Sequence, residues 1–195
     1  DEVHLVGNSQ GAYVAAKYAI DHPEKVGKIV YIGSNTVYQA MHDKPLRKMR
    51  SFLEVIGYDY TEESLRSFMT RNIANGTEVP EELIQLRHTA ATRPGVKEAN
   101  DAFDAYIARM NDEPKLWTRY SLKDALPKLD IPSIFIWGKQ DHVAPVEVGE
   151  KLAAMLPNVP FHYLDDCGHQ CQTDQPEIVN NLVIDFLQVK TAVPN

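Results

Sequence analysis

Ser9 stands at the centre of the pentapeptide 7–11, Gly-Asn-Ser-Gln-Gly, which follows the apolar run 3–6 and precedes a helix-like segment at 12–19. A serine hydroxyl is a weak nucleophile at neutral pH, so the fold must lift its oxygen out and present it to a base. A strand, a tight turn and a helix supply that geometry, and glycines at both ends of a G-x-S-x-G pattern let the backbone crowd. The pattern therefore predicts a nucleophile elbow with Ser9 as the nucleophile.

The residue after the serine is also expected to contribute to the chemistry. Gln10 begins the helix, and the first N–H groups of a helix have no intrahelical partners and can face an oxyanion. The sequence therefore predicts the backbone N–H of Gln10 as one donor of an oxyanion hole.

Two further residues complete a catalytic set in the chain order serine, acid, histidine. Asp141 comes shortly after the apolar run 131–138, and His169 comes shortly after the run 159–164. Because the carboxyl ends of parallel strands meet at one edge of a sheet, both side chains are expected beside Ser9. We expect His169 to take the serine proton while Asp141 holds the imidazole in the required tautomer.

Other titratable residues fit these roles less well. His142 is adjacent to Asp141, which would have to orient a different imidazole, and Asp165 and Asp166 remain an alternative acid although they precede His169 on the same turn. The other histidines lie inside expected strands, at a helix end or in the central helical region: His4, His22, His42, His88 and His162.

The cysteines argue against a metal site. Only two are present, Cys167 and Cys171, and with His169 they would crowd three ligands into five residues with no fourth nearby. We therefore predict no metal and no cofactor. Two cysteines without a disulfide framework favour a reducing, cytoplasmic setting.

The elements that must carry these residues alternate between strands and helices. Four apolar, β-rich runs predict parallel strands, at 3–6, 26–32, 131–138 and 159–164, and the run at 26–32 is expected to be buried. Three amphipathic or small-residue segments predict helices, at 12–19, 146–156 and from about 176. This alternation predicts the α/β class, with a parallel sheet and right-handed crossovers.

A helical insertion interrupts this pattern between residues 34 and 120. Helical periodicity predicts helices near 44–56, 61–74, 80–92 and 95–110, with prolines at two of the starts. We interpret residues 34–120 as a cap over the active site, and residues 1–33 and 121–195 as the core. A separate helical domain is the alternative.

Length and charge exclude several classes of protein. The 195 residues suffice for one domain with a sizeable core. Twenty basic against 27 acidic side chains give a net charge of −7, which offers no basic surface for nucleic acid or an anionic membrane. No stretch approaches the length of a transmembrane helix. A small-molecule substrate is the expected partner, and a homo-oligomer stays open.

The position of the elbow in the chain carries a further expectation. The sequence begins at Asp1, and its first residues already form the strand that feeds the elbow. In the α/β-hydrolase pattern, several strands and the loop with the second oxyanion donor come before that point. We therefore interpret the sequence as the C-terminal part of a longer enzyme, with a partial α/β-hydrolase fold.

Three motifs together resemble the meta-cleavage-product hydrolases, which are carbon–carbon bond hydrolases of the α/β-hydrolase fold. They are Gly7-Asn8-Ser9-x-Gly11, the turn Trp137-Gly138-x-x-Asp141, and Cys167-Gly168-His169 leading into an Asn-Leu-Val-Ile-Asp-Phe-Leu helix. The triad is shared with many esterases, so Asn8 is the more selective residue. The resemblance covers most of the chain and implies 2-hydroxy-6-oxo-hexa-2,4-dienoates, formed by ring cleavage of catechols in aromatic catabolism, as the substrate class.

The resemblance also implies residues that bind the substrate. The segment 80–87, Pro-Glu-Glu-Leu-Ile-Gln-Leu-Arg, is similar to the cap helix that carries the family's arginine, so Arg87 is expected to bind the substrate carboxylate in a bidentate pair. A surface position for Arg87 is the alternative, because the same helix has an apolar stripe. Asn8 is expected to hydrogen-bond at the same end of the substrate, and Gln170 is a further candidate contact.

Departures from the family pattern leave other functions open. Many members have an apolar residue at Gln10, a glycine at Ala12 and a tryptophan at Gln170, so the pocket here is expected to be more polar. A carboxylic-ester hydrolase is the second hypothesis. A non-catalytic binding protein that keeps the serine unused is the third. The sequence does not distinguish an acyl intermediate from an activated water.

Overall fold

The computed structural model describes residues 2–46, 57–74, 76 and 78–189, and its centre is a parallel sheet. The four strands are β1 (Val3–Asn8), β2 (Val26–Ile32), β3 (Ser133–Gly138) and β4 (Phe161–Leu164), in the spatial order β1-β2-β3-β4. Neighbouring strands are parallel, with Val6 opposite Val30 and Val30 opposite Ile134. The predicted parallel α/β sheet is confirmed, with each strand within a few residues of its expected range.

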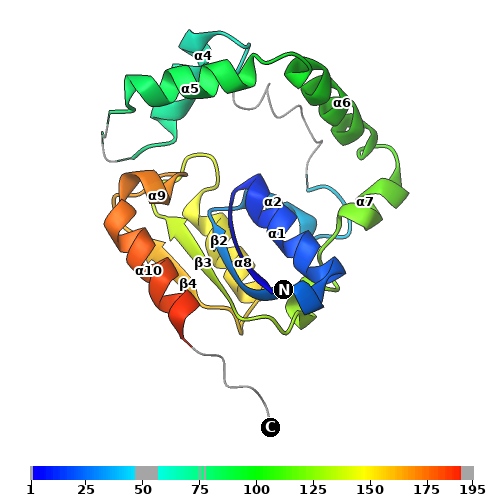
Figure 1. Cartoon of the computed structure of the whole chain (residues 1–195). Helices are drawn as coiled ribbons and strands as arrows, with labels where there is room; N and C mark the ends of the chain where they lie inside the picture. The colour runs from blue at the N-terminus through cyan, green and yellow to red at the C-terminus, as the bar shows by residue number, and fades with distance from the viewer. Residues whose placement is uncertain (1, 47–56, 75, 77, 190–195) are drawn as a thin grey trace.

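Helices cover both faces of this sheet (Figure 1). On one face lie α1 (Gln10–Asp21), α2 (Asn35–Ala40) and α8 (Val146–Met155), and on the other lie α9 (Cys171–Asp174) and α10 (Pro176–Gln188). Successive strand residues point to opposite faces, so Tyr31 packs in the cluster with α1 while Val30 and Ile32 pack in the cluster with α10. The sheet is thus the middle layer of three.

Small residues let α1 lie close to the sheet. Four alanines at helical spacing, Ala12, Ala15, Ala16 and Ala19, are all buried in the larger core cluster. A helix with such a stripe approaches a sheet more closely than one with long side chains, as the sequence predicts. This packing fixes the start of α1, where the elbow lies.

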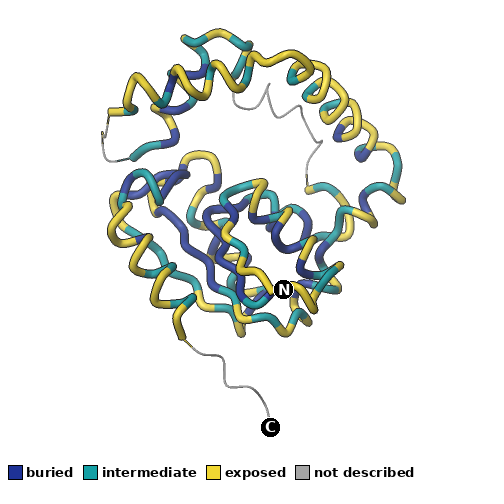
Figure 2. Tube along the Cα trace, in the orientation of Figure 1, coloured by how far each residue is buried: buried dark blue, intermediate teal, exposed yellow. Residues whose placement is uncertain are grey.

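The cap helices are α4 (Glu62–Arg71), α5 (Glu81–Ala91), α6 (Val96–Arg109) and α7 (Pro114–Tyr120). Figure 1 shows them as an arch over the carboxyl edge of the strands. Burial is concentrated in the sheet and α1, and the cap helices bury mainly their inner positions (Figure 2). Two small clusters hold them, one around Met69 and Ile84 and one around Ile107 and Trp117.

The helix predictions in this insertion are confirmed in part. The helices expected at 61–74, 80–92 and 95–110 correspond to α4, α5 and α6. Of the helix expected at 44–56, residues 44–46 are not helical and the remainder lies outside the described residues. The helices α2 and α7 were not predicted. No helix in the described part of the chain is long and apolar enough to cross a lipid bilayer.

A buried lysine links the sheet to the end of α10. Lys28 lies in the middle of β2, and its ammonium donates to the carbonyls of Phe186 at 2.7 Å and Leu187 at 3.1 Å, and also to that of Val189. Carbonyls at a helix C-terminus lack intrahelical partners and carry partial negative charge, so a cation is favourable there. Lys28 therefore anchors α10 although it interrupts an apolar strand.

Lys28→Ala should lower the free energy of unfolding of the full-length protein by about 2 kcal/mol, because charge-assisted bonds to the α10 carbonyls are lost. Urea unfolding followed by circular dichroism measures this change. Lys17→Ala is the matched control, since Lys17 forms an exposed ion pair with Asp21, and it should change stability by less than about 1 kcal/mol. Equal effects of the two substitutions would contradict the anchoring role.

Candidate active site

The backbone at Ser9 has the sharp turn expected of a nucleophile elbow. Ser9 lies between β1 and α1 with φ 56° and ψ −116°, a conformation that L residues rarely adopt. A Cβ on residue 7 would lie 2.4 Å from the Gly11 carbonyl oxygen and 2.6 Å from the Ala12 nitrogen, so only glycine fits there. A Cβ on Gly11 would meet no other part of the described chain within 4 Å, so the expectation that this glycine relieves crowding is wrong.

The neighbouring strand holds this strained turn in place. The Ser9 N–H donates to the Ile32 carbonyl at 2.9 Å, and the Ser34 hydroxyl donates to the Ser9 carbonyl at 2.7 Å. Ser34 is fully buried and also accepts from the Val37 N–H at 3.1 Å, which caps α2. Sequence reasoning missed Ser34, because nothing local indicates that its hydroxyl reaches a turn 25 residues earlier.

Asp141 and His169 meet in a buried hydrogen bond. The His169 Nδ1 lies 2.8 Å from the Asp141 Oδ2, and both side chains are almost completely buried. The Asp141 Oδ1 accepts from the N–H groups of Val143 at 2.8 Å and Ala144 at 2.7 Å. Because the backbone fixes one carboxylate oxygen, the other is aimed at the imidazole. A proton on Nδ1 then leaves Nε2 free to accept one.

Glycine is favoured next to this pair. Gly33, directly after β2, has φ +37°, and a Cβ there would lie 3.1 Å from the Asp141 Oδ2 and 3.7 Å from the His169 Nδ1. The alternative acid lies elsewhere, since Asp165 pairs with Lys139 at 2.9 Å and its side chain is 73% exposed. The geometry therefore favours Asp141 as the partner of His169.

Asn8 connects the elbow to the histidine loop. Its Nδ2 donates to the Ile32 carbonyl at 3.2 Å and to the His169 carbonyl at 3.1 Å. Carbonyl oxygens only accept hydrogen bonds, so these two contacts determine the orientation of the amide. The Oδ1 acceptor takes part in neither of these contacts. An amide oxygen can accept a hydrogen bond from a hydroxyl group but not from an ionised carboxylate. The contact expected of Asn8 is therefore limited to a substrate hydroxyl.

The elbow and the histidine loop are therefore adjacent. Proton transfer between the Ser9 hydroxyl and the His169 imidazole stays a prediction. Gln10 is the first residue of α1, where its backbone N–H has no partner within the helix.

Gln170 is buried directly after His169, and its Oε1 lies 3.4 Å from the Thr173 hydroxyl. Two buried residues that contact this loop, Asp174 and Asn72, were missed by sequence reasoning.

The two cysteines near His169 are unsuited to nucleophilic chemistry. Cys167 and Cys171 are buried free thiols. Burial raises the pKa of the Cys167 thiol to about 11 and also raises the pKa of the Cys171 thiol, so both stay protonated at neutral pH. In the described part of the chain, no three histidine, cysteine or acidic side chains are grouped so as to hold a metal ion.

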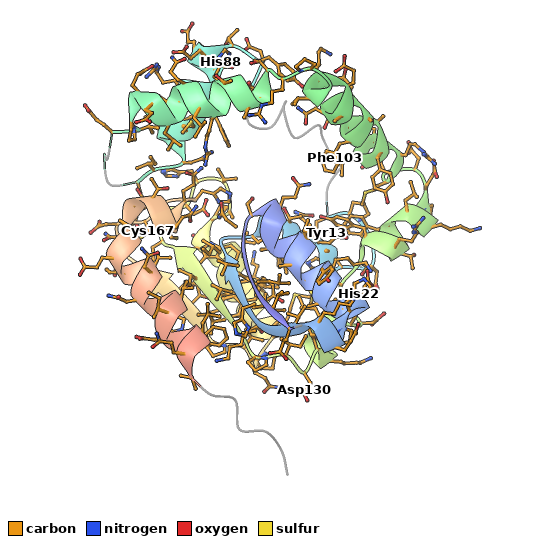
Figure 3. The ribbon with its side chains drawn as sticks, in the orientation of Figure 1. Tyr13, His22, His88, Phe103, Asp130 and Cys167 are labelled. Atoms are coloured by element: carbon orange, nitrogen blue, oxygen red, sulfur yellow. The ribbon has the colours of Figure 1, made fainter. Side chains whose placement is uncertain are left out.

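A cavity of about 850 Å³ opens beside Ser9 and Gln10, between α1 and the cap helices. Its apolar wall includes Tyr13 of α1 and Phe103 of α6, which lie on opposite sides of the space between core and cap (Figure 3). The other aromatic and aliphatic residues that line it are Val14, Ile20, Tyr106, Ile107 and Tyr120. A cavity of this size and character suits a small organic molecule.

The predicted arginine lies apart from this cavity. Arg87 is exposed on α5 and is not among the residues that line the space beside Ser9. Among the described residues, two cations line it, Lys17 and Arg119, and Lys17 is paired with Asp21 at 2.5 Å. The structure thus brings together Asn8, Asp141 and His169, and it adds Arg119 of α7 as a cation at the cavity wall.

Comparisons with known proteins identify the family of the fold. The family model described as alpha/beta hydrolase fold matches residues 1–176. A 2-hydroxy-6-oxononadienedioate/2-hydroxy-6-oxononatrienedioate hydrolase of Paraburkholderia phymatum is 29% identical over 187 residues, which are 96% of this chain and 62% of that protein. The enzyme with the same description from Burkholderia vietnamiensis is 29% identical over 185 residues, 95% of this chain and 62% of that protein. The chain thus spans about 62% of the length of these curated relatives.

Solved structures show the same fold. A meta-cleavage product hydrolase from Pseudomonas fluorescens IP01 superposes with a TM-score of 0.67 at 25% identity, covering 95% of this chain and 64% of that one. A membrane phospholipase A superposes with a TM-score of 0.64 at 29% identity, covering 95% of this chain and 56% of that one. The homologues therefore include meta-cleavage product hydrolases and a membrane phospholipase A.

Replacing Asp141 tests the buried pair. Asp141→Asn should lower kcat of the full-length enzyme by roughly 10⁴-fold, because an amide cannot accept both from the loop N–H groups and from the imidazole. Steady-state kinetics measure the loss. Asp165→Asn is the matched control and should retain wild-type turnover. The reverse outcome, with the loss in Asp165→Asn, would make Asp165 the catalytic acid.

Proposed function

Because the chain belongs to the α/β hydrolase fold family, we propose that the full-length protein is a serine hydrolase whose catalytic triad is Ser9, His169 and Asp141. The buried hydrogen bond between His169 and Asp141, joined to the elbow through Asn8, is the observation that carries the proposal. It supports a histidine held with one nitrogen committed to the acid and the other available to the serine.

The proposed chemistry follows from these positions. His169 Nε2 accepts a proton either from the Ser9 hydroxyl or from a water that the serine positions, and the oxygen so activated attacks the substrate carbonyl carbon. The backbone N–H of Gln10 stabilises the resulting oxyanion. When the bond to the leaving group breaks, His169 returns the proton to that group. If Ser9 is the attacking oxygen, a water that His169 deprotonates then hydrolyses the acyl-serine, which releases the acid product and restores the Ser9 hydroxyl. The base and the oxyanion donor come from the chain and the nucleophile is either Ser9 or a water, so the proposed reaction uses no cofactor.

The substrates we propose are 2-hydroxy-6-oxo-hexa-2,4-dienoates, which are cleaved at a carbon–carbon bond. The activities for which the curated relatives are named support this class, as does the likeness to a meta-cleavage product hydrolase structure. The cavity beside Ser9 has room for such a molecule, and its aromatic wall suits a conjugated carbon chain. We propose that Asn8 Oδ1 accepts a hydrogen bond from the hydroxyl group that a 2-hydroxy dienoate supplies.

A cation must balance the substrate carboxylate. We propose Arg87 of the cap for this role, on the similarity of its helix to the family's cap helix, with Arg119 at the cavity wall as the second candidate. A guanidinium binds a carboxylate through two parallel hydrogen bonds, which fixes the orientation of the substrate and balances its charge.

The two free cysteines support a cytoplasmic location for the enzyme.

A carboxylic-ester hydrolase is the second candidate function. The polar, buried Gln170 beside His169 and the likeness to a membrane phospholipase A favour it. The same triad would serve both reactions, because each begins with attack on a carbonyl carbon.

Removing the nucleophile or the base tests the proposal. Ser9→Ala and His169→Ala should each lower turnover by roughly 10⁴-fold or more, because neither residue acts without the other. The loss of the dienoate absorbance and the release of p-nitrophenol from a neutral ester measure the two candidate activities. A non-catalytic binding protein would show no turnover in the wild type, and unchanged behaviour in both variants.

Arginine substitutions distinguish the two carboxylate anchors. Arg87→Ala should raise KM for a dienoate about tenfold to a hundredfold, because a charge-assisted bidentate contact is lost, while a neutral p-nitrophenyl ester should be unaffected. Arg119→Ala is the matched variant at the cavity wall. If Arg119→Ala gives the selective loss and Arg87→Ala does not, the anchor is Arg119. If both substrates are affected equally, neither arginine binds the carboxylate.

A further inference from the structure

Three consecutive residues of the histidine loop are held by three different parts of the molecule. The Gly168 N–H donates to the Asp174 Oδ2 at 2.6 Å, and the His169 carbonyl accepts from Asn8 at 3.1 Å. The Gln170 N–H donates to the carbonyl of Asn72, at the end of α4, at 3.3 Å. The catalytic histidine is therefore positioned by contacts from α9, the elbow and the cap.

Asp174 joins two of these parts directly. Besides the Gly168 N–H, its carboxylate accepts from the Ala74 N–H, with distances of 3.1 Å to Oδ1 and 3.2 Å to Oδ2. Ala74 lies three residues beyond the end of α4, and Asp174 ends α9. One carboxylate thus binds a backbone amide of the cap and a backbone amide of the histidine loop.

Close packing leaves little freedom at this junction. A Cβ on Gly168 would lie 2.7 Å from the Asn72 carbonyl oxygen and 3.2 Å from the Ala74 nitrogen, so the cap segment 72–74 lies directly on the loop. Asn72 is 1% exposed and Asp174 is 5% exposed. The two N–H groups are in a poorly hydrated contact, where losing a charged acceptor leaves them unsatisfied.

We propose that Asp174 is a positioning residue that couples the cap to the catalytic base. Its carboxylate fixes the peptide that leads into His169 and ties that peptide to Ala74, so the imidazole has its working orientation only when the cap is in place. The role rests on the proposed function of His169 as the base. Asp174 touches no reacting atom and acts through the backbone of the loop.

Asp174→Asn keeps the volume of the side chain but places an NH₂ group against one of the two N–H donors. We expect kcat of the full-length enzyme to fall roughly a hundredfold with KM little changed, because a small displacement of the base costs about that much. Asp165→Asn is the matched control: its carboxylate is on the same loop but pairs at the surface with Lys139, and kcat should be unchanged.

A second readout does not depend on the substrate class. Phosphonylation of Ser9 by a fluorophosphonate probe requires the base but not a dienoate, so its rate should fall in Asp174→Asn by the same factor, and Ser9→Ala should show no labelling. If the wild type labels rapidly but does not cleave dienoates, the substrate proposal fails while the slow labelling of Asp174→Asn still supports the positioning role. If Asp174→Asn keeps the wild-type kcat and labelling rate and only its melting temperature falls, the positioning role of Asp174 is wrong.

A substitution at Ala74 tests the same contact from the cap. It also tests the positioning role if Asp174→Asn does not fold. Ala74→Pro removes the cap N–H and leaves Asp174 and Gly168 in place, whereas Ala74→Ser keeps the N–H and serves as its control. We expect kcat and the labelling rate to fall in Ala74→Pro and to stay at wild-type values in Ala74→Ser. Wild-type rates in a folded Ala74→Pro enzyme would show that the cap does not position the base.

Discussion

The buried hydrogen bond between Asp141 and His169 is the interaction on which the rest of the site depends. It forms only because β3 and β4 are neighbours, so that the loops at their carboxyl ends meet at one edge of the sheet. Gly33 also contributes to its geometry, because the absence of a Cβ at this position leaves space for the side chains of Asp141 and His169. The order of the strands therefore decides whether the histidine can act as a base.

The elbow depends on the same arrangement. Ser9 keeps an unfavourable backbone conformation because Ile32 and Ser34, at the end of β2, bind its N–H and its carbonyl. Asn8 donates a hydrogen bond to the His169 carbonyl and so links the elbow to the loop of His169. The proposed nucleophile and the proposed base are thus held relative to each other by hydrogen bonds to their backbone groups, which involve neither the Ser9 hydroxyl nor the His169 imidazole.

Much of the fold could be predicted, for physical reasons that differ between elements. The central strands β2 and β3 are buried on both faces and therefore appear as nearly continuous apolar runs, and the alanine stripe of α1 has helical spacing. The short helices α2 and α7 were missed, because six or seven residues give too little periodicity and their stability comes from packing around Val37 and Trp117. The amide of Asn8 was expected at the substrate, whereas its hydrogens are used within the protein.

The sequence by itself determined the class of the fold, the elbow at Ser9 and the choice of Asp141 and His169, because strand burial, turn sterics and chain order are local or nearly local properties. Tertiary structure decided which residues support the triad and which side chains line the cavity. Asn8 and His169 are separated by 161 residues, and Ala74 and Asp174 by 100. Contacts at such separations arise only when the sheet and the cap pack, so no periodicity or motif in the chain predicts them.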